Sequence, residues 1–254
     1  MRYKCTVSYD GSQFHGFQTQ DNLRTVQIEI ENALEIIHKR KVNIFACSRT
    51  DAGVHALGQI FHFDSEIDIP EWNMQSALNS RIPNDIYIKK VEKVNDEFHS
   101  RYQVSKKEYH YLIDVGEYDP LKRNYRYYPK YRNTNIDAME EASKVFIGVH
   151  DFKSFTKNHQ IENTIREIYD ITFERSGTLV IIKFVGSGFL HNMIRIIVGM
   201  LLEVGWGNIT KEDLEGILNQ KDRTLAPKIA PPNGLYLYKI LGCDVVFIFG
   251  LAPF

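Results

Sequence analysis

The chain has 254 residues, of which 43% are hydrophobic and 25% are charged, and its formal net charge is −1. This composition is ordinary for a water-soluble globular protein, so it excludes a collagen-like or intrinsically disordered chain, and the length suits one large domain or two modest ones. The three cysteines are odd in number and far apart, which excludes a disulfide framework and suits a reducing cytoplasm. The N-terminus reads as a strand rather than a signal peptide, and the most apolar stretch, 189–204, is short for a bilayer and contains an arginine. We therefore expect a cytoplasmic protein with no membrane-spanning segment.

The first hundred residues alternate between patterns typical of strands and of helices. Residues 2–9 carry apolar side chains at every second position, as a half-buried strand does. Thr25 can cap the helix that follows, in which apolar residues recur at the helical period. Further strands are predicted at 42–47, 58–64 and 85–94, with a short helix at 71–80. The resulting order, βαββαβ, is ferredoxin-like, and we assign residues 1–104 to a first α+β half.

Residues 105–254 are predicted to form a second α+β half. Its strands are expected at 106–115, 165–175, 178–186, 235–241 and 244–249. Its helices are expected at 136–147, 189–204 and 211–220. The predicted fold class is therefore α+β, with two ferredoxin-like halves of mostly antiparallel strands joined across a central cleft.

One segment has a local excess of positive charge despite the near-neutral total. Between Arg101 and Arg132 there are eight Lys or Arg residues against four Asp or Glu, and eight tyrosines are interspersed. Cations release counterions from phosphates and aromatic rings stack on exposed bases, so the mixture suits an RNA surface. A solvated, tyrosine-rich strand and loop explains the same pattern without any ligand.

The segment Cys47 to Ala56 contains the first candidate for chemistry. Asp51 lies on a glycine-containing turn between two predicted strands, where a carboxylate can reach into a cleft. Arg49, two residues earlier, projects on the same side if the backbone is extended, and it could hold a phosphate or an extruded base there. The competing interpretation is an Asp-Ala-Gly turn in which the carboxylate bonds its own backbone.

The second candidate is an arginine inside the apolar stretch 189–204. Eleven of these sixteen residues are apolar, so a helix formed by them must be largely buried. The remaining positions form one narrow stripe, and Arg195 emerges from it into apolar surroundings, where a guanidinium requires an anionic partner. That partner is either an active-site carboxylate, which the pairing would keep ionised as a nucleophile must be, or a structural acid such as Glu203. The stripe comprises His191, Asn192, Arg195, Gly199 and Glu203.

The ordered motifs of the chain resemble those of the tRNA pseudouridine synthase A family, which acts on the anticodon stem-loop. The segment SRTDAGVHA, residues 48–56, is similar to the family signature. The other matching segments, which span nearly the whole chain, are 9–11, 16–20, 25–27, 98–101, 106–111, 189–195, 222–226 and 234–237. Two departures are visible, because the family usually has glycine at position 48 and often tryptophan at position 17, where this chain has Ser48 and Phe17. Serine would disfavour a glycine-specific backbone angle, so Ser48 could alter activity or target choice.

The resemblance implies a pseudouridine synthase fold and an isomerase that converts uridine to pseudouridine at tRNA positions 38 to 40. It makes Asp51 the nucleophile, attacking either the base or the sugar carbon of a flipped-out nucleotide. It assigns Tyr109 to stacking on the uracil and to proton transfer, Leu235 to the other face of the base, Arg195 to an ion pair with Asp51, and Arg49 to RNA contact. It implies a homodimer that uses no cofactor, metal or nucleotide.

Two other classes of protein compete with this interpretation. A non-catalytic RNA-binding protein could keep the fold without turnover, although the intact set of candidate residues argues against it. A glycoside hydrolase would need a second placed acid, and the turn around Asp51 contains none. The histidines His55, His62 and His99 match no zinc-binding spacing.

Overall fold

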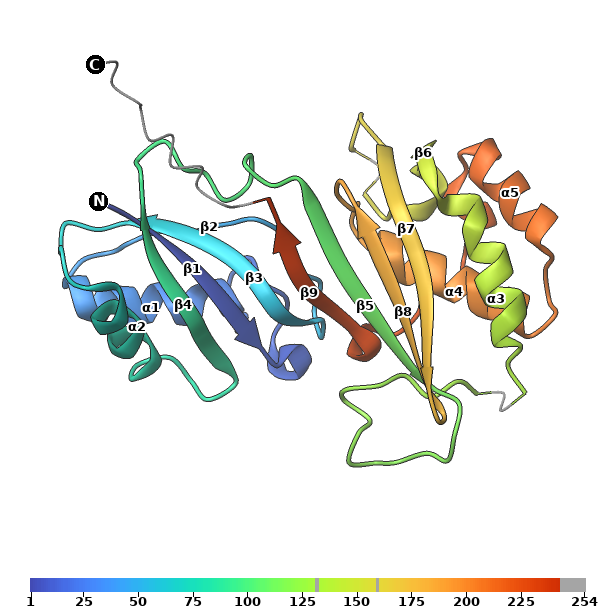
Figure 1. Cartoon of the computed structure of the whole chain (residues 1–254), viewed down its shortest axis with the longest axis horizontal. Coiled ribbons are helices and arrows are strands. Elements are labelled where there is room, and N and C mark those ends of the chain that lie inside the picture. Colours follow the sequence, from blue (N-terminus) through green and yellow to red (C-terminus); the bar gives the residue numbers. More distant parts are fainter. Residues whose placement is uncertain (131–132, 159, 243–254) are drawn as a thin grey trace, which may run out of the picture.

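The computed structural model describes residues 1–130, 133–158 and 160–242 (Figure 1). The strands are β1 (Arg2–Tyr9), β2 (Phe45–Ala46), β3 (His55–Asp64), β4 (Ile86–Val94), β5 (Lys106–Asp114), β6 (Gly148–Asp151), β7 (Ile165–Ser176), β8 (Leu179–Gly186) and β9 (Leu235–Leu241). The α-helices are α1 (Val26–His38), α2 (Glu71–Asn79), α3 (Ile136–Ser143), α4 (Met193–Gly205) and α5 (Lys211–Gln220). Short 3-10 helices cover Gly11–Gln13, Lys144–Phe146, Lys153–Phe155, Arg223–Leu225 and Pro232–Gly234.

The strands form one continuous sheet in the order β4-β1-β3-β9-β5-β8-β7-β6, with β2 paired to β3. In the N-terminal half the order β4-β1-β3-β2 is that of a ferredoxin-like βαββαβ unit. In the C-terminal half the order β9-β5-β8-β7 repeats it, and β6 is added at the edge. The predicted α+β class with two ferredoxin-like halves is therefore confirmed.

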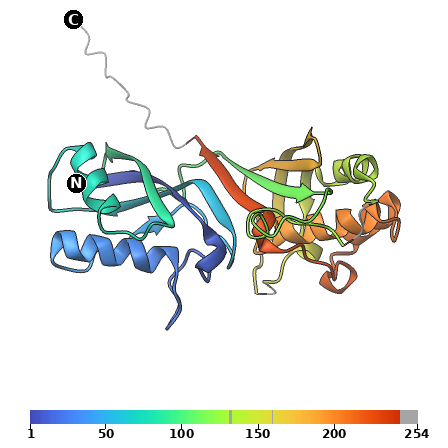
Figure 2. The ribbon, with the colours of Figure 1, turned by 90° about the horizontal axis from the view of Figure 1, so that it is seen from below.

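The two halves meet where β3 pairs with β9. This contact is short and parallel, with His55 opposite Tyr236 and Ala56 opposite Leu237, whereas the other strand pairs are antiparallel. Figures 1 and 2 show α1 and α2 against the N-terminal strands at one end of an elongated molecule. The helices α3, α4 and α5 gather at the other end, and β9 and β5 run between the two groups. The loop that precedes β3 therefore lies at the junction of the halves.

Several predicted boundaries were wrong for identifiable reasons. The strand predicted at 42–47 is limited to β2, because Val42 and Ile44 are buried without pairing in the sheet. The helix predicted at 189–204 begins only at Met193. Asn192, directly before it, has a left-handed φ of 62°, so the helix cannot extend back to residue 189. The predicted helix 136–147 ends as a 3-10 turn, and β6 was not predicted. The predicted strand 244–249 lies outside the described residues.

Among the residues described, no helix is both long enough and apolar enough to cross a bilayer.

Candidate active site

Asp51 lies on the connection between β2 and β3, and the loop that contains Phe17 packs against that connection. The backbone N–H of Phe17 donates to the carbonyl oxygen of Thr50 at 3.1 Å. The hydroxyl groups of Thr50 and Tyr9 are 2.8 Å apart and buried. The loop is thus held at Thr50 through both its backbone and its side chain, and the neighbouring Asp51 side chain is 20% exposed. Fixed neighbours give the carboxylate a defined direction.

Two glycines allow the loops to approach this closely. Gly53 has a φ of +77°, and a Cβ atom there would lie 2.8 Å from Cγ of Pro232. Gly16 has a φ of +96°, and its Cβ atom would lie 2.8 Å from the carbonyl oxygen of Thr50. Only glycine adopts these angles without strain, so both positions explain why glycine stands in the motifs that contain them.

Arg195 reaches Asp51 from the other half of the molecule. Its Nη1 lies 3.3 Å from Oδ2 of Asp51 and also donates to Oδ1 of Asn192 at 2.9 Å. Its Nε donates to the carbonyl oxygen of Ala230 at 2.8 Å. Three partners fix the planar guanidinium, whose side chain is only 14% exposed, beside the carboxylate.

The alternative partner considered for Arg195, Glu203, lies elsewhere on α4. Glu203 is 3.5 Å from Nζ of Lys228 and accepts a hydrogen bond from Asn208. Of the two open possibilities, the structure therefore favours the pair with Asp51.

His191 is a neighbour of Asp51 to which the sequence assigned no role. Its Nε2 is 3.5 Å from Oδ1 of Asp51, and its side chain is 55% exposed. Because the helix starts at Met193, His191 belongs to the preceding turn, which brings its ring to the carboxylate. The sequence signal that could have identified His191 was its position within the motif 189–195.

Tyr109 projects from β5 into the same space. It is 6% exposed, its ring meets Phe189 edge-on at 5.3 Å between centroids, and its hydroxyl lies 3.1 Å from Oγ of Ser48. Burial raises the pKa of the Tyr109 hydroxyl, and the nearby Cys47 and Asp51 add to the rise, while the bond to Ser48 opposes it. The phenol therefore keeps its proton at neutral pH.

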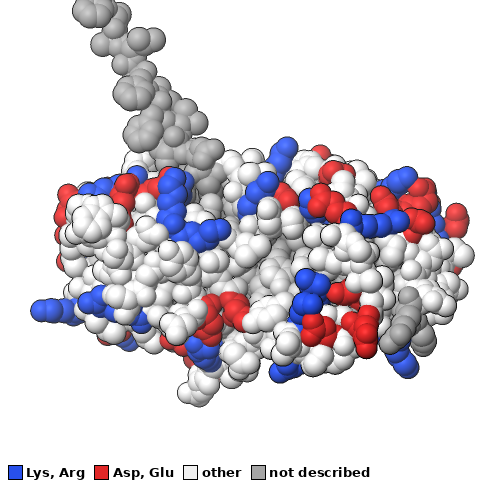
Figure 3. All heavy atoms as spheres, turned by 60° about the horizontal axis from the view of Figure 1, so that its bottom comes forward, with Lys and Arg blue, Asp and Glu red and all other residues white. Residues whose placement is uncertain are grey.

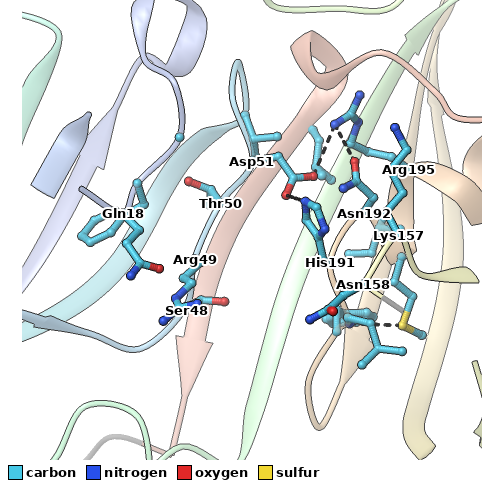
Figure 4. A pocket seen from close by; sticks show the side chains of 18 of the residues that line it. Gln18, Ser48, Arg49, Thr50, Asp51, Lys157, Asn158, His191, Asn192 and Arg195 are labelled. Atoms are coloured by element: carbon cyan, nitrogen blue, oxygen red, sulfur yellow. Dashed lines mark hydrogen bonds and ion pairs between the residues drawn. The ribbon is translucent and has the colours of Figure 1, made fainter. Parts of the chain in front are cut away.

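All five predicted site residues line one cavity of about 980 Å³. Asp51 and the exposed Arg49 come from the N-terminal half, whereas Tyr109, Arg195 and the buried Leu235 come from the C-terminal half. Figure 4 shows Asp51 facing Arg195, Asn192 and His191 across the cavity, with Ser48 and Arg49 on the same side as Asp51. The cavity thus lies between the halves, as the predicted cleft does.

The cavity is lined by far more positive than negative charge. Its Lys and Arg side chains are Arg49, Arg101, Lys107, Lys157, Arg166 and Arg195. Within the part of the chain that the structure describes, Asp51 is the one acidic residue of the lining. A retaining or inverting glycoside hydrolase needs two carboxylates, so this lining argues against that class.

The basic, tyrosine-rich segment contributes to the cavity only through its first residues. Arg101, Lys107 and Tyr109 line it, but none of the described residues 115–130 does. In that loop Arg126 pairs with Asp114 at 3.0 Å, and the Tyr125 hydroxyl donates to Asp10 at 2.7 Å. Tyr131 and Arg132 lie outside the described residues.

His55, the histidine of the 48–56 motif, is a buried hydrogen-bonding residue. Its Nδ1 accepts from the backbone N–H of Gly11 at 3.0 Å, and its Nε2 donates to the carbonyl oxygen of Asn124 at 2.8 Å. Burial lowers the pKa of His55, so the ring is neutral at neutral pH. It ties the start of β3 to two loops.

A model of the tRNA pseudouridine synthase family matches residues 6–103 and 142–241. The chain is 45% identical to the tRNA pseudouridine synthase A of Anoxybacillus flavithermus, covering 94% of this chain and 98% of that protein. It is 43% identical to the tRNA pseudouridine synthase A of Bacillus subtilis, with the same coverage. The chain therefore belongs to the tRNA pseudouridine synthase family, and it is an isomerase. Within that family it is similar to tRNA pseudouridine synthase A over nearly its whole length.

Proposed function

We propose that the chain isomerises uridine to pseudouridine in the anticodon stem-loop of tRNA, at positions 38 to 40, with Asp51 as the nucleophile. The observation that carries this proposal is the Asp51 carboxylate, held 3.3 Å from Arg195 in a cavity built by both halves of the molecule. A fixed guanidinium beside a carboxylate favours the anion, which is the form able to attack carbon.

The reaction exchanges one bond to the ribose for another. Asp51 adds to C6 of the uracil or to C1′ of the ribose, and the C1′–N1 bond breaks. The uracil turns and C5 bonds to C1′, and this step displaces Asp51 if the carboxylate had attacked C1′. C5 then loses its proton and N1 gains one, and Asp51 leaves C6 at this stage if it had added there. The reaction is an isomerisation with no net oxidation or reduction and no atom added, so the proposal includes no cofactor, metal or nucleotide.

The other predicted residues have roles that follow from their place in the cavity. Tyr109 stacks on the flipped uracil and its hydroxyl handles the proton at C5, because a tyrosine offers a rigid apolar face with a polar tip. Leu235 presses on the opposite face of the base. Arg49, exposed at the cavity, contacts the RNA and occupies the space that the flipped base leaves.

Local charge supports an RNA substrate although the net charge is −1. Figure 3 shows Lys and Arg mixed with Asp and Glu over the face that it presents, with no single basic patch. The cavity differs from that surface, because among the described residues six Lys or Arg line it against one acid. Cations close to the bound phosphates supply the affinity, whatever the total charge is.

The proposal also includes a homodimer in the cytoplasm, as the family resemblance implies. Analytical ultracentrifugation of the purified protein tests the oligomeric state. A sedimentation coefficient of a 29.6 kDa monomer at all concentrations would reject the dimer without affecting the chemistry.

The decisive experiment incubates the purified protein with unmodified tRNA transcripts, without metal or nucleotide, and maps the pseudouridines formed. We expect modification at positions 38 to 40. Asp51→Asn should lower the single-turnover rate by at least about ten-thousandfold, because an amide is a poor nucleophile, while folding and tRNA binding persist. Asp170→Asn, at an exposed acid of β7, is the matched control and should keep the wild-type rate. Full activity of Asp51→Asn would remove Asp51 from the mechanism.

A further inference from the structure

Ser48 lies on the loop of Asp51, and its side chain contacts a residue of the other half. Its Oγ is 3.1 Å from the hydroxyl oxygen of Tyr109. We propose that Ser48 is a positioning residue, whose hydroxyl binds the Tyr109 hydroxyl and orients it toward the flipped base. This inference rests on the proposed function and deepens it.

The backbone of Ser48 is anchored, so its hydroxyl has a fixed origin. The side-chain amide of Gln59 donates to the carbonyl oxygen of Ser48 at 2.6 Å, and Gln59 is fully buried. The N–H of Cys47 donates to the carbonyl oxygen of Ile60 at 2.8 Å. Because its backbone is fixed, the Ser48 hydroxyl can orient the Tyr109 hydroxyl. A hydroxyl on a mobile loop would instead adjust its own position to its partner.

Lys107 favours one direction of this hydrogen bond, with Ser48 as the donor. It lies on β5 two residues before Tyr109, so both side chains leave the same face of the strand. Its Nζ donates to the carbonyl oxygen of Cys47 at 3.2 Å and reaches Oγ of Ser48 at 3.5 Å. An ammonium group can only donate, so Lys107 occupies an acceptor position of the Ser48 oxygen.

The hydrogen of the Ser48 hydroxyl is then available to the Tyr109 oxygen. A Tyr109 oxygen that accepts from Ser48 leaves its own hydrogen free to point into the cavity, where the base would lie. Lys107, Ser48 and Tyr109 therefore form a chain of donors that ends at the substrate.

The backbone conformation at position 48 does not require glycine. Among the described non-glycine residues, positive φ angles occur at Asn22, Lys39, Asn192 and Lys221, and Ser48 is not one of them. The concern raised by the sequence, that serine strains a glycine-specific angle, is therefore unfounded. A glycine at position 48 would remove the hydroxyl without relieving strain, which makes Ser48→Gly as informative a variant as Ser48→Ala.

The test measures tRNA affinity and the single-turnover rate of pseudouridine formation separately. For Ser48→Ala and Ser48→Gly we expect a roughly tenfold lower rate, the usual effect of one lost hydrogen bond in the transition state, with tRNA affinity within about twofold of wild type. Ser48→Thr, which retains the hydroxyl, should recover most of the rate. The control Ser80→Ala removes an exposed hydroxyl bonded to the carbonyl oxygen of Ala77 and should change neither quantity.

A double-mutant cycle separates positioning from a merely structural effect. If Ser48 acts through the Tyr109 hydroxyl, Ser48→Ala should not lower the residual rate of Tyr109→Phe any further. A wild-type rate for Ser48→Ala, or an equal loss in both backgrounds, would overturn the inference. Either result leaves the proposed function standing as long as the wild-type protein is active and Asp51→Asn is not. Absence of pseudouridine with the wild-type protein would reject the proposed function itself.

Discussion

The two halves of the molecule have the same strand order but differ in the connections that they elaborate. In the N-terminal half the second and third strands, β2 and β3, are joined by residues 47–54, which include Asp51. In the C-terminal half the corresponding strands, β7 and β8, are joined only by residues 177–178. The helices show the reverse, because the longer one belongs to the C-terminal half. Helix α2 has nine residues, of which two are buried, whereas α4 has thirteen and buries all but Arg195.

The difference divides the chemistry between the halves. One half provides a carboxylate on a loop held by a neighbouring loop, and the other provides a guanidinium on a helix whose other residues are fixed by the core. The ion pair of Asp51 and Arg195 joins residues 144 positions apart, one from each of the halves that meet where β3 and β9 pair. Each half is incomplete as a site, so removing the contribution of either half should abolish activity.

Removing the C-terminal contribution tests this division most directly. Arg195→Met deletes the cation 3.3 Å from Asp51, and we expect the single-turnover rate to fall about a thousandfold, because a preorganised charge beside the nucleophile is lost. The control is Lys228→Met, which removes a cation paired with α4 outside the cavity and should keep the rate. A wild-type rate for Arg195→Met in a protein that melts normally would break the proposed pairing.

The next largest effect concerns the aromatic residue that the C-terminal half adds to the cavity. Tyr109→Phe keeps the ring but loses the hydroxyl, so we expect tRNA binding to persist while the rate falls about a hundredfold, as for a lost proton-transfer group. Tyr111→Phe is the matched control, because Tyr111 lies on the same face of β5 and donates to the carbonyl oxygen of Pro231 outside the cavity. Unchanged turnover of Tyr109→Phe would limit Tyr109 to stacking and would also remove the basis for the role of Ser48.

The corresponding connections of the two halves contain glycines that sharpen the comparison. Gly53 and Gly177 both have positive φ, at +77° and +59°. A Cβ atom at Gly53 would lie 2.8 Å from Cγ of Pro232, whereas a Cβ atom at Gly177 would have none of the described residues within 4 Å apart from its chain neighbours. For Gly177→Ala we expect a loss of about 1 kcal/mol in unfolding free energy and a wild-type rate. For Gly53→Ala we expect a loss of about 2 kcal/mol in unfolding free energy and a lower rate of pseudouridine formation, because the loop that carries Asp51 must shift. Chemical denaturation and single-turnover assays measure both effects, and equal behaviour of the two variants would contradict the comparison.

The regular elements of the fold could be predicted because their signals are local. The apolar alternation of residues 2–9 and the Thr25 cap led to β1 and α1, and the element sequence of the first half led to its ferredoxin-like order. The start of α4 could not be predicted, because the left-handed conformation of Asn192 leaves no mark in the apolar pattern. β6 was missed because four residues are too few for a period to show.

Which residues gather at the cavity could be predicted from the sequence, but their contacts with one another could not. Motif resemblance named Asp51, Arg195, Tyr109, Arg49 and Leu235, and these residues do share one cavity. Periodicity alone left the partner of Arg195 open between Asp51 and Glu203, because helical spacing carries no information about the opposite half. The contacts of Ser48 with Tyr109 and of His191 with Asp51 depend on how the halves dock, which no local pattern encodes.

The smallest expected effect concerns an acid that stabilises the C-terminal half without taking part in its chemistry. Asp114, at the end of β5, is nearly buried and lies 3.0 Å from Arg126. Burial alone raises the pKa of its carboxyl, but hydrogen bonds from Thr178, the Gly116 N–H and Arg126 outweigh burial and lower the pKa below its ordinary value of 3.8. Through Thr178 the acid also supports the short connection between β7 and β8.

A lowered pKa in the folded state fixes the pH range in which Asp114 contributes. The stabilisation is fully present above the unfolded value near pH 4 and is lost as the pH falls through the lower folded value. Asp114→Asn should therefore cost about 1 kcal/mol of unfolding free energy at pH 7, and this difference from the wild type should vanish in strong acid, with the rate at pH 7 unchanged. Asp119→Asn, at an acid paired with Lys122 on the surface, should cost much less at either pH. A lower rate for Asp114→Asn would mean that Asp114 also affects the residues of the cavity. Its role could then no longer be limited to stabilising the C-terminal half.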